Sequence, residues 1–168
     1  MEKLNYISIS EDAINRIKSD GAFLNIKSKD NKEINVMTIG WTAIGYMWRK
    51  PIMIVMVRKS RFTHHIIENA CSFTVSVPIS NLKDALDFCG TKSGRDFNKF
   101  KEVNLSVIPA QKVNTPIINT PGFHFECKIV YKSKMNPELL CSEYKEDVYP
   151  DNDYHSFYFG EIVDCYKL

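Results

Sequence analysis

Residues 123–131 read Phe-His-Phe-Glu-Cys-Lys-Ile-Val-Tyr, and this stretch gives the clearest indication of the fold. Large or apolar side chains fall on every second position, at Phe123, Phe125, Cys127, Ile129 and Tyr131. A period of two is typical of a β-strand with one face in a core. The stretch therefore predicts a long, half-buried strand.

Further strands are predicted on both sides of it, at residues 23–26, 34–39, 53–57, 73–77 and 156–166. Asp30-Asn31-Lys32 separates the first two and predicts a hairpin, and Pro78 ends the fourth. In the last strand, Gly160 predicts a bulge or a close backbone approach. Most of the chain thus has strand character.

Helical segments are fewer. Tyr6 to Ile9 alternates briefly as a strand would, and Ser10 followed by two acidic residues predicts a helix N-cap. That helix should end near Gly21, and helical spacing also predicts short helices at 60–69 and 80–89. Together these elements predict a mainly β protein, an antiparallel Greek-key-like barrel with short helical inserts.

Composition limits the class of protein. With 168 residues, 44% of them hydrophobic, the chain can form one sizeable core, so a single domain over residues 1–168 is expected. The net charge is +2, from 22 basic and 20 acidic residues, and both signs are spread along the chain, so nucleic acid is not expected as a ligand. No signal peptide or membrane-spanning stretch is present in the sequence, so we expect a cytoplasmic protein that binds no membrane.

The five cysteines are odd in number, widely spaced and without a Cys-x-x-Cys pair. This pattern argues against a disulfide framework and against a thiolate zinc site. Cys89, next to Gly90, is either a redox thiol or a small buried hydrophobe. Adjacent His64 and His65 would face different sides of a helix, so no metal site is predicted.

The glycines lack the spacing of a dinucleotide fingerprint or a phosphate-binding loop, which argues against Rossmann and P-loop folds. Arg58-Lys-Ser-Arg-Phe-Thr63 is more informative, because it follows a buried strand and precedes a helix. Its hydroxyls and arginines suit a phosphate, and a helix start favours an anion. The alternative is an ordinary Ser60 N-cap with two solvated arginines.

A second polar cluster runs from Gly90 to Phe100 and combines glycines, hydroxyls, bases and aromatics. Such a loop could cover a polar aromatic ligand, with Gly94 allowing close approach of a ring. The alternative is a helix end that turns into a solvated loop. The acidic run from Glu143 to Asp153 is interpreted as a solvated loop.

In this order, five segments resemble the flavin reductase-like family with the FMN-binding split barrel, which includes flavoredoxin. They are Asn35–Trp41, Arg58–Thr63, Phe73–Pro78, Ser93–Asp96 with Lys99, and Phe159–Ile162. The resemblance implies a homodimer of split barrels with FMN near the subunit interface. The family often has Asn where this chain has Ser76, so a contact from that strand is in doubt.

The resemblance also implies site residues. The isoalloxazine would meet Thr38, Ile39, Gly40, Trp41 and Thr42. The phosphate would lie at Arg58, Ser60, Arg61 and Thr63. A loop closing over the flavin would contribute Ser93, Gly94, Arg95 and Lys99. His155 is the candidate catalytic residue, since some family members place a histidine comparably, near the nicotinamide.

The functional expectation is an FMN oxidoreductase of the flavin reductase type that takes electrons from NAD(P)H. Because the sequence has no nicotinamide-binding domain, a nicotinamide would have to stack transiently on the flavin. A flavoredoxin-like electron carrier, reduced by a partner protein and without a nicotinamide substrate, is the first alternative. A non-catalytic FMN-binding barrel is the second.

Overall fold

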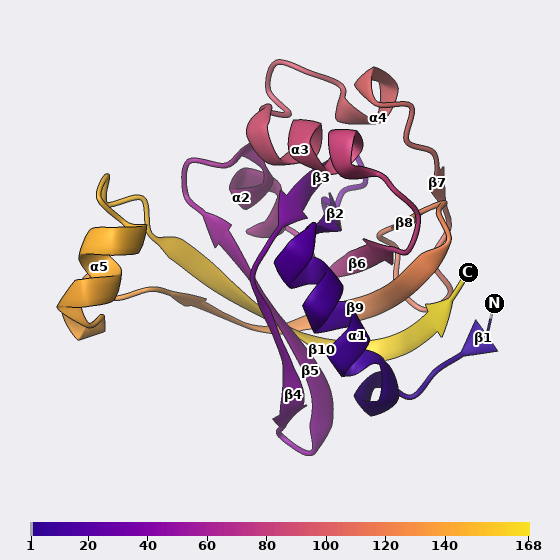
Figure 1. Cartoon of the computed structure of the whole chain (residues 1–168), viewed down its shortest axis with the longest axis horizontal. Helices are drawn as coiled ribbons and strands as arrows, with labels where there is room; N and C mark the ends of the chain where they lie inside the picture. Colours follow the sequence, from indigo (N-terminus) through magenta and orange to yellow (C-terminus); the bar gives the residue numbers. More distant parts are fainter. Residues whose placement is uncertain (1) are drawn as a thin grey trace.

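The computed structural model describes residues 2–168, and one antiparallel sheet forms its centre (Figure 1). Its strands are β1 (Glu2–Lys3), β2 (Ala22–Lys27), β3 (Ile34–Ile39), β4 (Thr42–Met47), β5 (Lys50–Arg58), β6 (Ser72–Pro78), β9 (Gly122–Lys134) and β10 (His155–Lys167). A separate ribbon pairs β7 (Val107–Ile108) with β8 (Ile117–Ile118). The helices are α1 (Tyr6–Ser19), α2 (Phe62–Ile67), α3 (Lys83–Thr91), α4 (Lys99–Glu102) and α5 (Ser142–Val148), with a 3-10 turn η1 (Pro137–Leu139).

The sheet curls into a barrel that stays open on one side. The strand order is β3-β2-β6-β9-β10-β5-β4, with β1 added on β10. The two edge strands, β3 and β4, are consecutive in the chain and are joined by Gly40 and Trp41. The chain therefore crosses the gap of the barrel at these two residues. The predicted antiparallel split barrel is confirmed.

The core fills the inside of the barrel and extends to α1. Fully buried Leu24, Val55 and Tyr158 come from strands far apart in the sequence. Helix α1 adds Ile9, Ala13 and Ile17 to the same cluster. A second cluster lies under α3, where buried Ala85 and Leu86 pack on Phe23 and Val36. Strands β2 and β3 therefore contribute side chains to both clusters, one on each face of the sheet.

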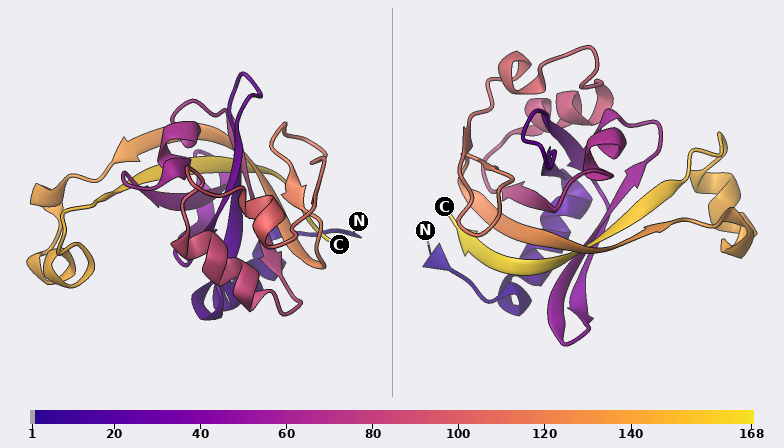
Figure 2. Two further views of the ribbon diagram at one scale, coloured as in Figure 1. Left: turned by 90° about the horizontal axis from the view of Figure 1, so that it is seen from above. Right: turned by 180° about the vertical axis from the view of Figure 1, so that it is seen from behind.

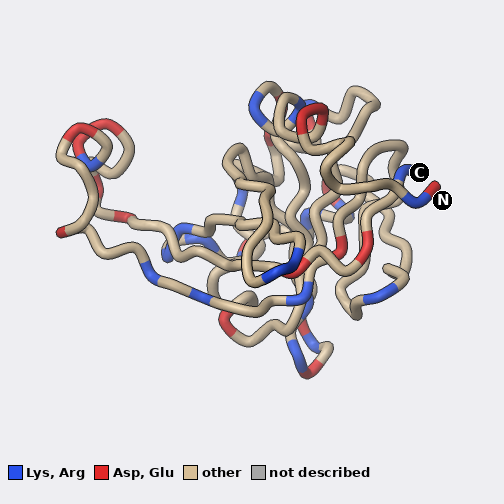
Figure 3. Tube along the Cα trace, turned by 90° about the horizontal axis from the view of Figure 1, so that it is seen from below, with Lys and Arg blue, Asp and Glu red and all other residues tan. Residues whose placement is uncertain are grey.

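Strands β9 and β10 form a long hairpin whose far end projects from the barrel and carries α5 (Figures 1 and 2). We call residues 135–154 the arm. Acidic residues gather around its tip, as Figure 3 shows. At the barrel end of the hairpin, the register shifts between Phe159 and Gly160, and a Cβ at Gly160 would lie 2.5 Å from the Phe73 ring. The predicted bulge and close approach are both confirmed.

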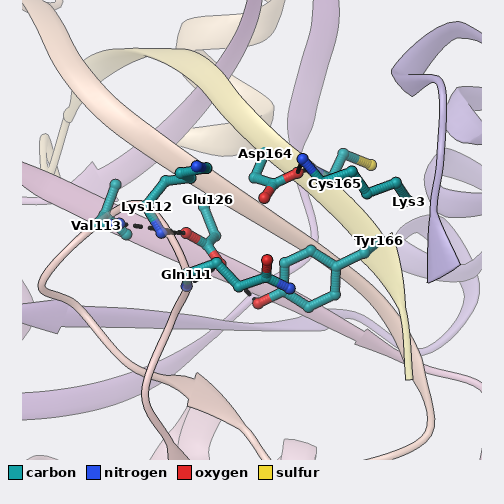
Figure 4. A network of polar contacts seen from close by, with 8 residues as sticks. All are labelled: Lys3, Gln111, Lys112, Val113, Glu126, Asp164, Cys165 and Tyr166. Atoms are coloured by element: carbon teal, nitrogen blue, oxygen red, sulfur yellow. Dashed lines mark hydrogen bonds and ion pairs between the residues drawn. The ribbon is translucent and has the colours of Figure 1, made fainter. Parts of the chain in front are cut away.

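A buried carboxylate on β9 holds the loop that follows β7 (Figure 4). Glu126 Oε1 accepts hydrogen bonds from Gln111 N at 2.7 Å and from Tyr166 Oη at 2.6 Å. Its Oε2 accepts from Lys112 N at 2.6 Å and from Val113 N at 3.2 Å. Glu126 is fully buried, so the chain itself supplies these donors in place of water. We call this group the Glu126 cradle.

Several local predictions were wrong. Helix α1 begins at Tyr6, with Asn5 Oδ1 accepting from Ile7 N at 2.9 Å, so neither the strand at 6–9 nor the Ser10 cap exists. A side-chain cap, Asn5, was available five residues earlier than the predicted Ser10. The helix does end at Ser19, just before Gly21. The acidic run is not a simple loop, because it contains α5.

Strand β4 and its turn were not predicted. The turn at Trp48 and Arg49 places both residues at positive φ, 51° and 60°, which non-glycine residues rarely adopt. Trp48 packs edge-on or tilted against Tyr131 and Phe159, at 6.1 and 5.9 Å between ring centroids. Contacts distant in sequence therefore accompany this hairpin turn.

Within residues 2–168, no helix is long and apolar enough to cross a membrane. The five cysteines are free thiols, with Cys89, Cys127 and Cys165 buried. In the same described part of the chain, no group of three His, Cys, Asp or Glu side chains could hold a metal ion.

Candidate functional site

A cleft of about 260 Å³ opens where the chain crosses the gap of the barrel. It is lined by Met37, Thr38, Ile39, Gly40, Trp41, Met56, Arg58, Arg61, Gly90 and His155. A Cβ placed on Gly40 would meet no atom within 4 Å, so this backbone faces open space. The cleft exists because β3 and β4 do not pair with each other.

A smaller pocket of about 130 Å³ shares Arg61 with the cleft. Its lining includes six more of the predicted site residues: Ser60, Thr63, Ser93, Gly94, Arg95 and Lys99. The two predicted polar clusters, at 58–63 and 90–100, therefore meet in space around Arg61. Figure 1 shows why: α2 and the segment after α3 lie on the same side of the barrel.

Two arginines of this region are held by backbone carbonyls. Arg58, at the end of β5, donates to Asp153 O at 3.1 Å and to Val148 O at 3.0 Å. Arg61 donates to Gly90 O at 2.6 Å. Burial lowers the pKa of Arg61 and the Asp153 charge partly opposes this, but the group stays cationic at neutral pH. Neutral acceptors thus fix these cations without cancelling their charge.

Lys99 adds a third, buried cation at the first residue of α4. Its Nζ donates to Cys89 O at 2.8 Å and to Val36 O at 3.0 Å. Burial lowers its pKa to about 8. Burial also raises the pKa of the neighbouring Cys89 thiol to about 11, which disfavours the reactive thiolate. Of the two interpretations of Cys89, the structure favours the small buried hydrophobe.

Ser60 presents two donors in the turn between β5 and α2. Its backbone N and its Oγ donate to the Asp153 carboxylate, at 3.2 and 2.5 Å. Arg95 donates to Ser60 O at 3.2 Å. Helix α2 has only six residues, and its N-cap is Arg61, so Ser60 does not cap it as the alternative interpretation required. The groups of this turn that could hold an anion are therefore Ser60 and the basic side chains.

His155, at the start of β10, is buried against the cleft wall. Its Nδ1 lies 2.7 Å from Tyr149 Oη, and its ring centroid lies 5.3 Å from that of Trp41. Burial first, and then the Arg58 charge, lower its pKa to about 4. The imidazole is therefore neutral near pH 7. With Nδ1 bonded to Tyr149, Nε2 is the nitrogen that can serve a ligand.

Other predicted residues have structural partners. Thr42 does not line the cleft, and its Oγ1 donates to Ile54 O at 2.9 Å. Buried Thr63 Oγ1 accepts from Asn35 Nδ2 at 2.8 Å. A Cβ at Gly94 would lie 2.5 Å from Asn35 Oδ1 and 2.7 Å from the Phe62 ring, so the ring that Gly94 admits is a protein side chain. Ser93 Oγ accepts from Arg95 N at 3.2 Å.

Ser76 is away from the cleft. Its Oγ accepts from Ile118 N at 3.1 Å and lies 3.1 Å from His124 Nδ1. Because this side chain is fully buried and bonded inside the protein, it offers nothing to a ligand in the cleft. The doubt about a contact from this strand is thereby supported.

Sequence reasoning missed the residues that the arm brings against Arg58 and His155 of the cleft wall. Tyr149 and Asp153 lie in the run interpreted as a solvated loop, yet Tyr149 is buried under Arg58, with the guanidinium 5.0 Å from its ring centroid. Tyr149-Pro150, an aromatic followed by proline within an acidic run, was the available signal. Met37 and Met56, two further apolar residues of the cleft wall, also went unassigned.

Comparison with known proteins gives one family match. The flavin reductase like domain family matches residues 26–167. An uncharacterized protein of Archaeoglobus fulgidus is 31% identical over 106 residues, which are 63% of this chain and 59% of that protein. The match thus spans less than two thirds of this relative.

Solved structures share the fold. Flavoredoxin from Methanosarcina acetivorans has a TM-score of 0.68 and 25% identity, over 89% of this chain and 68% of that one. The FMN-binding protein from Thermus thermophilus has a TM-score of 0.67 and 18% identity, over 88% and 69%. A Shewanella frigidimarina protein described as a flavin reductase with a split barrel domain has a TM-score of 0.68 and 14% identity, over 95% and 74%.

Proposed function

The chain belongs to the flavin reductase-like domain family, and on that premise we propose that it is an FMN-dependent oxidoreductase that takes electrons from NAD(P)H. One observation carries the proposal: the cleft at the gap of the barrel has an apolar wall beside a group of uncancelled cations. This combination matches a ligand with a flat aromatic end and an anionic end.

The residues present fit FMN. Met37, Ile39 and Trp41 form the apolar wall, and the open backbone at Gly40 offers close approach to a ring. Arg58, Arg61 and Ser60 supply donors for a phosphate. A flavin, when bound, supplies the redox chemistry, and the protein supplies orientation and exclusion of water.

His155 is the residue that we assign to positioning the nicotinamide. A neutral imidazole offers one donor and one acceptor, which suits a carboxamide. The Tyr149 hydroxyl fixes the ring orientation from Nδ1, and burial keeps the ring uncharged. Efficient hydride transfer needs the reacting atoms roughly 3–3.5 Å apart, so a fixed hydrogen-bonding group beside the cleft has a direct effect on rate.

We also propose that two copies associate to complete the site. The cleft of about 260 Å³ is smaller than the roughly 300–1,000 Å³ of typical ligand pockets. Trp48 and Tyr131 remain 59% and 50% exposed near the projecting hairpin, and aromatic residues are enriched at interfaces. Sedimentation of the FMN-loaded protein at micromolar concentration should give a dimer, and a monomer would contradict this part.

The second candidate function is a flavoredoxin-like electron carrier reduced by a partner protein. The likeness to flavoredoxin from Methanosarcina acetivorans favours it, since that name describes a carrier and not a reductase. A non-catalytic FMN-binding barrel is the third. The cytoplasmic location expected from the sequence stays a prediction.

The visible absorption spectrum of the purified protein with FMN, before and after adding NADH or NADPH, tests the proposal. Bleaching of the flavin band supports the reductase, and a His155→Ala variant should then keep FMN but bleach more slowly, on the order of tenfold. Unchanged kinetics would remove His155 from the mechanism. Bleaching only by a reduced partner protein supports the carrier, and failure to bind FMN contradicts all three functions.

A further inference from the structure

The Ser60 turn already binds an anion, and this anion is a side chain of the protein itself, the Asp153 carboxylate. Both donors of Ser60, its backbone N and its Oγ, are bonded to the Asp153 carboxylate at 3.2 and 2.5 Å. We infer that Asp153 is a specificity-determining residue that competes with the ligand's phosphate for Ser60 and so makes the bound flavin exchangeable. This inference rests on the proposed function and concerns how firmly its ligand is held.

The surroundings of Asp153 are those of an anion site. Arg58, Arg61 and Lys99 all donate to backbone carbonyls, and none of them forms an ion pair among the contacts found within residues 2–168. The Asp153 charge acts on Arg61 and on His155, raising the pKa of both against the effect of burial. Asp153 therefore supplies negative charge to a region that otherwise has an excess of cations.

The carboxylate can leave without unfolding the arm. Arg58 holds the backbone of this segment independently, through Asp153 O and Val148 O. Asn152 N also donates to Tyr149 O at 2.9 Å, which closes the turn before Asp153. The Asp153 residue is partly exposed, so its side chain can rotate into water, where a free carboxylate is well solvated. A side-chain rotation is enough to vacate Ser60.

Competition follows from the charges and the donor count. A phosphate dianion and a carboxylate cannot share two donors on one serine, and like charges at this distance repel. FMN must displace Asp153 to use Ser60, whereas riboflavin, which lacks the phosphate, need not. Asp153 should thus weaken FMN binding and leave riboflavin binding nearly unchanged. The result is a smaller preference for FMN and faster release.

The test compares Asp153→Asn with Asp151→Asn, which removes the same charge from an exposed residue of the same turn. Dissociation constants for FMN and for riboflavin are measured by quenching of flavin fluorescence. Asp153→Asn should bind FMN about tenfold more tightly, with riboflavin and the Asp151→Asn variant within about twofold of the parent. Stopped-flow release of FMN should slow in proportion.

Each other outcome contradicts the inference in a distinguishable way. If the parent binds FMN and Asp153→Asn binds it no more tightly, the inference fails and the proposed function stands. If the affinities for FMN and for riboflavin change together, Asp153 acts only on the shape of the arm, and the inference fails. If neither the parent nor the variant binds any flavin, the proposed function fails and the inference with it. An Asp153→Ala variant, which cannot accept from Ser60 at all, should show at least the same gain for FMN.

Discussion

Two carboxylates in this protein accept hydrogen bonds from loop backbone, and they differ in what surrounds them. Glu126 is fully buried, and four donors of the chain converge on its two oxygens. Asp153 is partly exposed, and its carboxylate accepts from one residue, Ser60, which lines the smaller pocket beside the cleft. No ligand can reach the donors around Glu126, so nothing can take the place of its carboxylate. The Asp153 carboxylate, in contrast, occupies the donors of Ser60, which we propose a ligand can reach.

The difference also separates stability from function. A buried anion whose donors are all internal contributes to folding, and its removal leaves backbone N–H groups without a partner. An anion at a cleft edge contributes less to folding, because water replaces it when it leaves. Mutations in the Glu126 cradle should therefore change stability, and mutations around Ser60 should change binding.

The largest effect is expected from Glu126→Gln. The amide nitrogen would face two of the four donors that now meet a carboxylate oxygen, so the free energy of unfolding should fall by about 3 kcal/mol or more. Urea unfolding measures it, with Glu138→Gln on the exposed arm as the matched control. FMN affinity below the unfolding transition should not change. A loss below about 1 kcal/mol would show that the loop finds other acceptors.

Arg61→Ala should give the next effect, at the other region. Arg61 lines both the cleft and the smaller pocket, and its removal deletes a charged donor that we propose for the phosphate. FMN affinity should fall roughly 10- to 100-fold, from a charged hydrogen bond of about 1.5–3 kcal/mol. Arg49→Ala, in the exposed turn after β4, is the control. Equal loss of FMN and riboflavin would mean that Arg61 only supports Gly90.

These two regions also show what a sequence can predict. The strand of Glu126 was predicted from its alternation, and the bulge at Gly160 from a lone glycine in a strand, because both signals are local. The partners of Glu126 were not predicted, because the sequence of Gln111–Val113 has no pattern that indicates a bond to a distant carboxylate. Alternation tells which side chains face inward but not which loop packs on them.

The candidate site, too, has a part that was predicted from the sequence and a part that was not. The composition of residues 58–63, with its hydroxyls and bases, predicts an anion site, and this stays a prediction. The structure places these residues beside the 90–100 loop. Asp153 and Tyr149 contact Arg58 of the cleft wall because the long β9–β10 hairpin returns the arm to this residue, a contact across about 90 residues. The turn at Trp48 and Arg49 has the same cause, because it packs on residues of that hairpin. The positions of these residues depend on contacts between distant segments, which local sequence patterns do not reveal.

Lowering the pH should reduce the free energy of unfolding through one histidine near each of the two regions, and by a similar amount for each. His124, near the cradle, and His155, at the cleft, each have a pKa lowered to about 4, in both cases mainly by burial. Between the unfolded value near 6.5 and the folded value near 4, the unfolded state binds more protons, so stability falls as pH falls through this window. From pH 7 to pH 5, each histidine should remove about 1–2 kcal/mol from the free energy of unfolding.

Urea midpoints at pH 7 and pH 5 measure this dependence. His124→Asn and His155→Asn should each lose their own share of it, and only the second should alter the reduction of bound flavin. A pH dependence that neither substitution reduces would assign the acid sensitivity to other groups.

The smallest effect is expected from Tyr149→Phe, which removes one hydroxyl and keeps the ring under Arg58. The lost hydrogen bond to His155 Nδ1 should lower the free energy of unfolding by about 0.5–1.5 kcal/mol, and FMN affinity should stay within about twofold. Flavin reduction by NADH should slow by a few-fold, less than in His155→Ala, because the imidazole stays in place but loses the group that fixes its orientation. Tyr144→Phe, on the exposed side of α5, is the matched control and should change neither quantity. A Tyr149→Phe variant that loses stability while reducing its flavin at the parent rate would show that the Tyr149 hydroxyl is structural. The ring contacts of His155 with Trp41 and with residue 149 would then be enough to orient the imidazole.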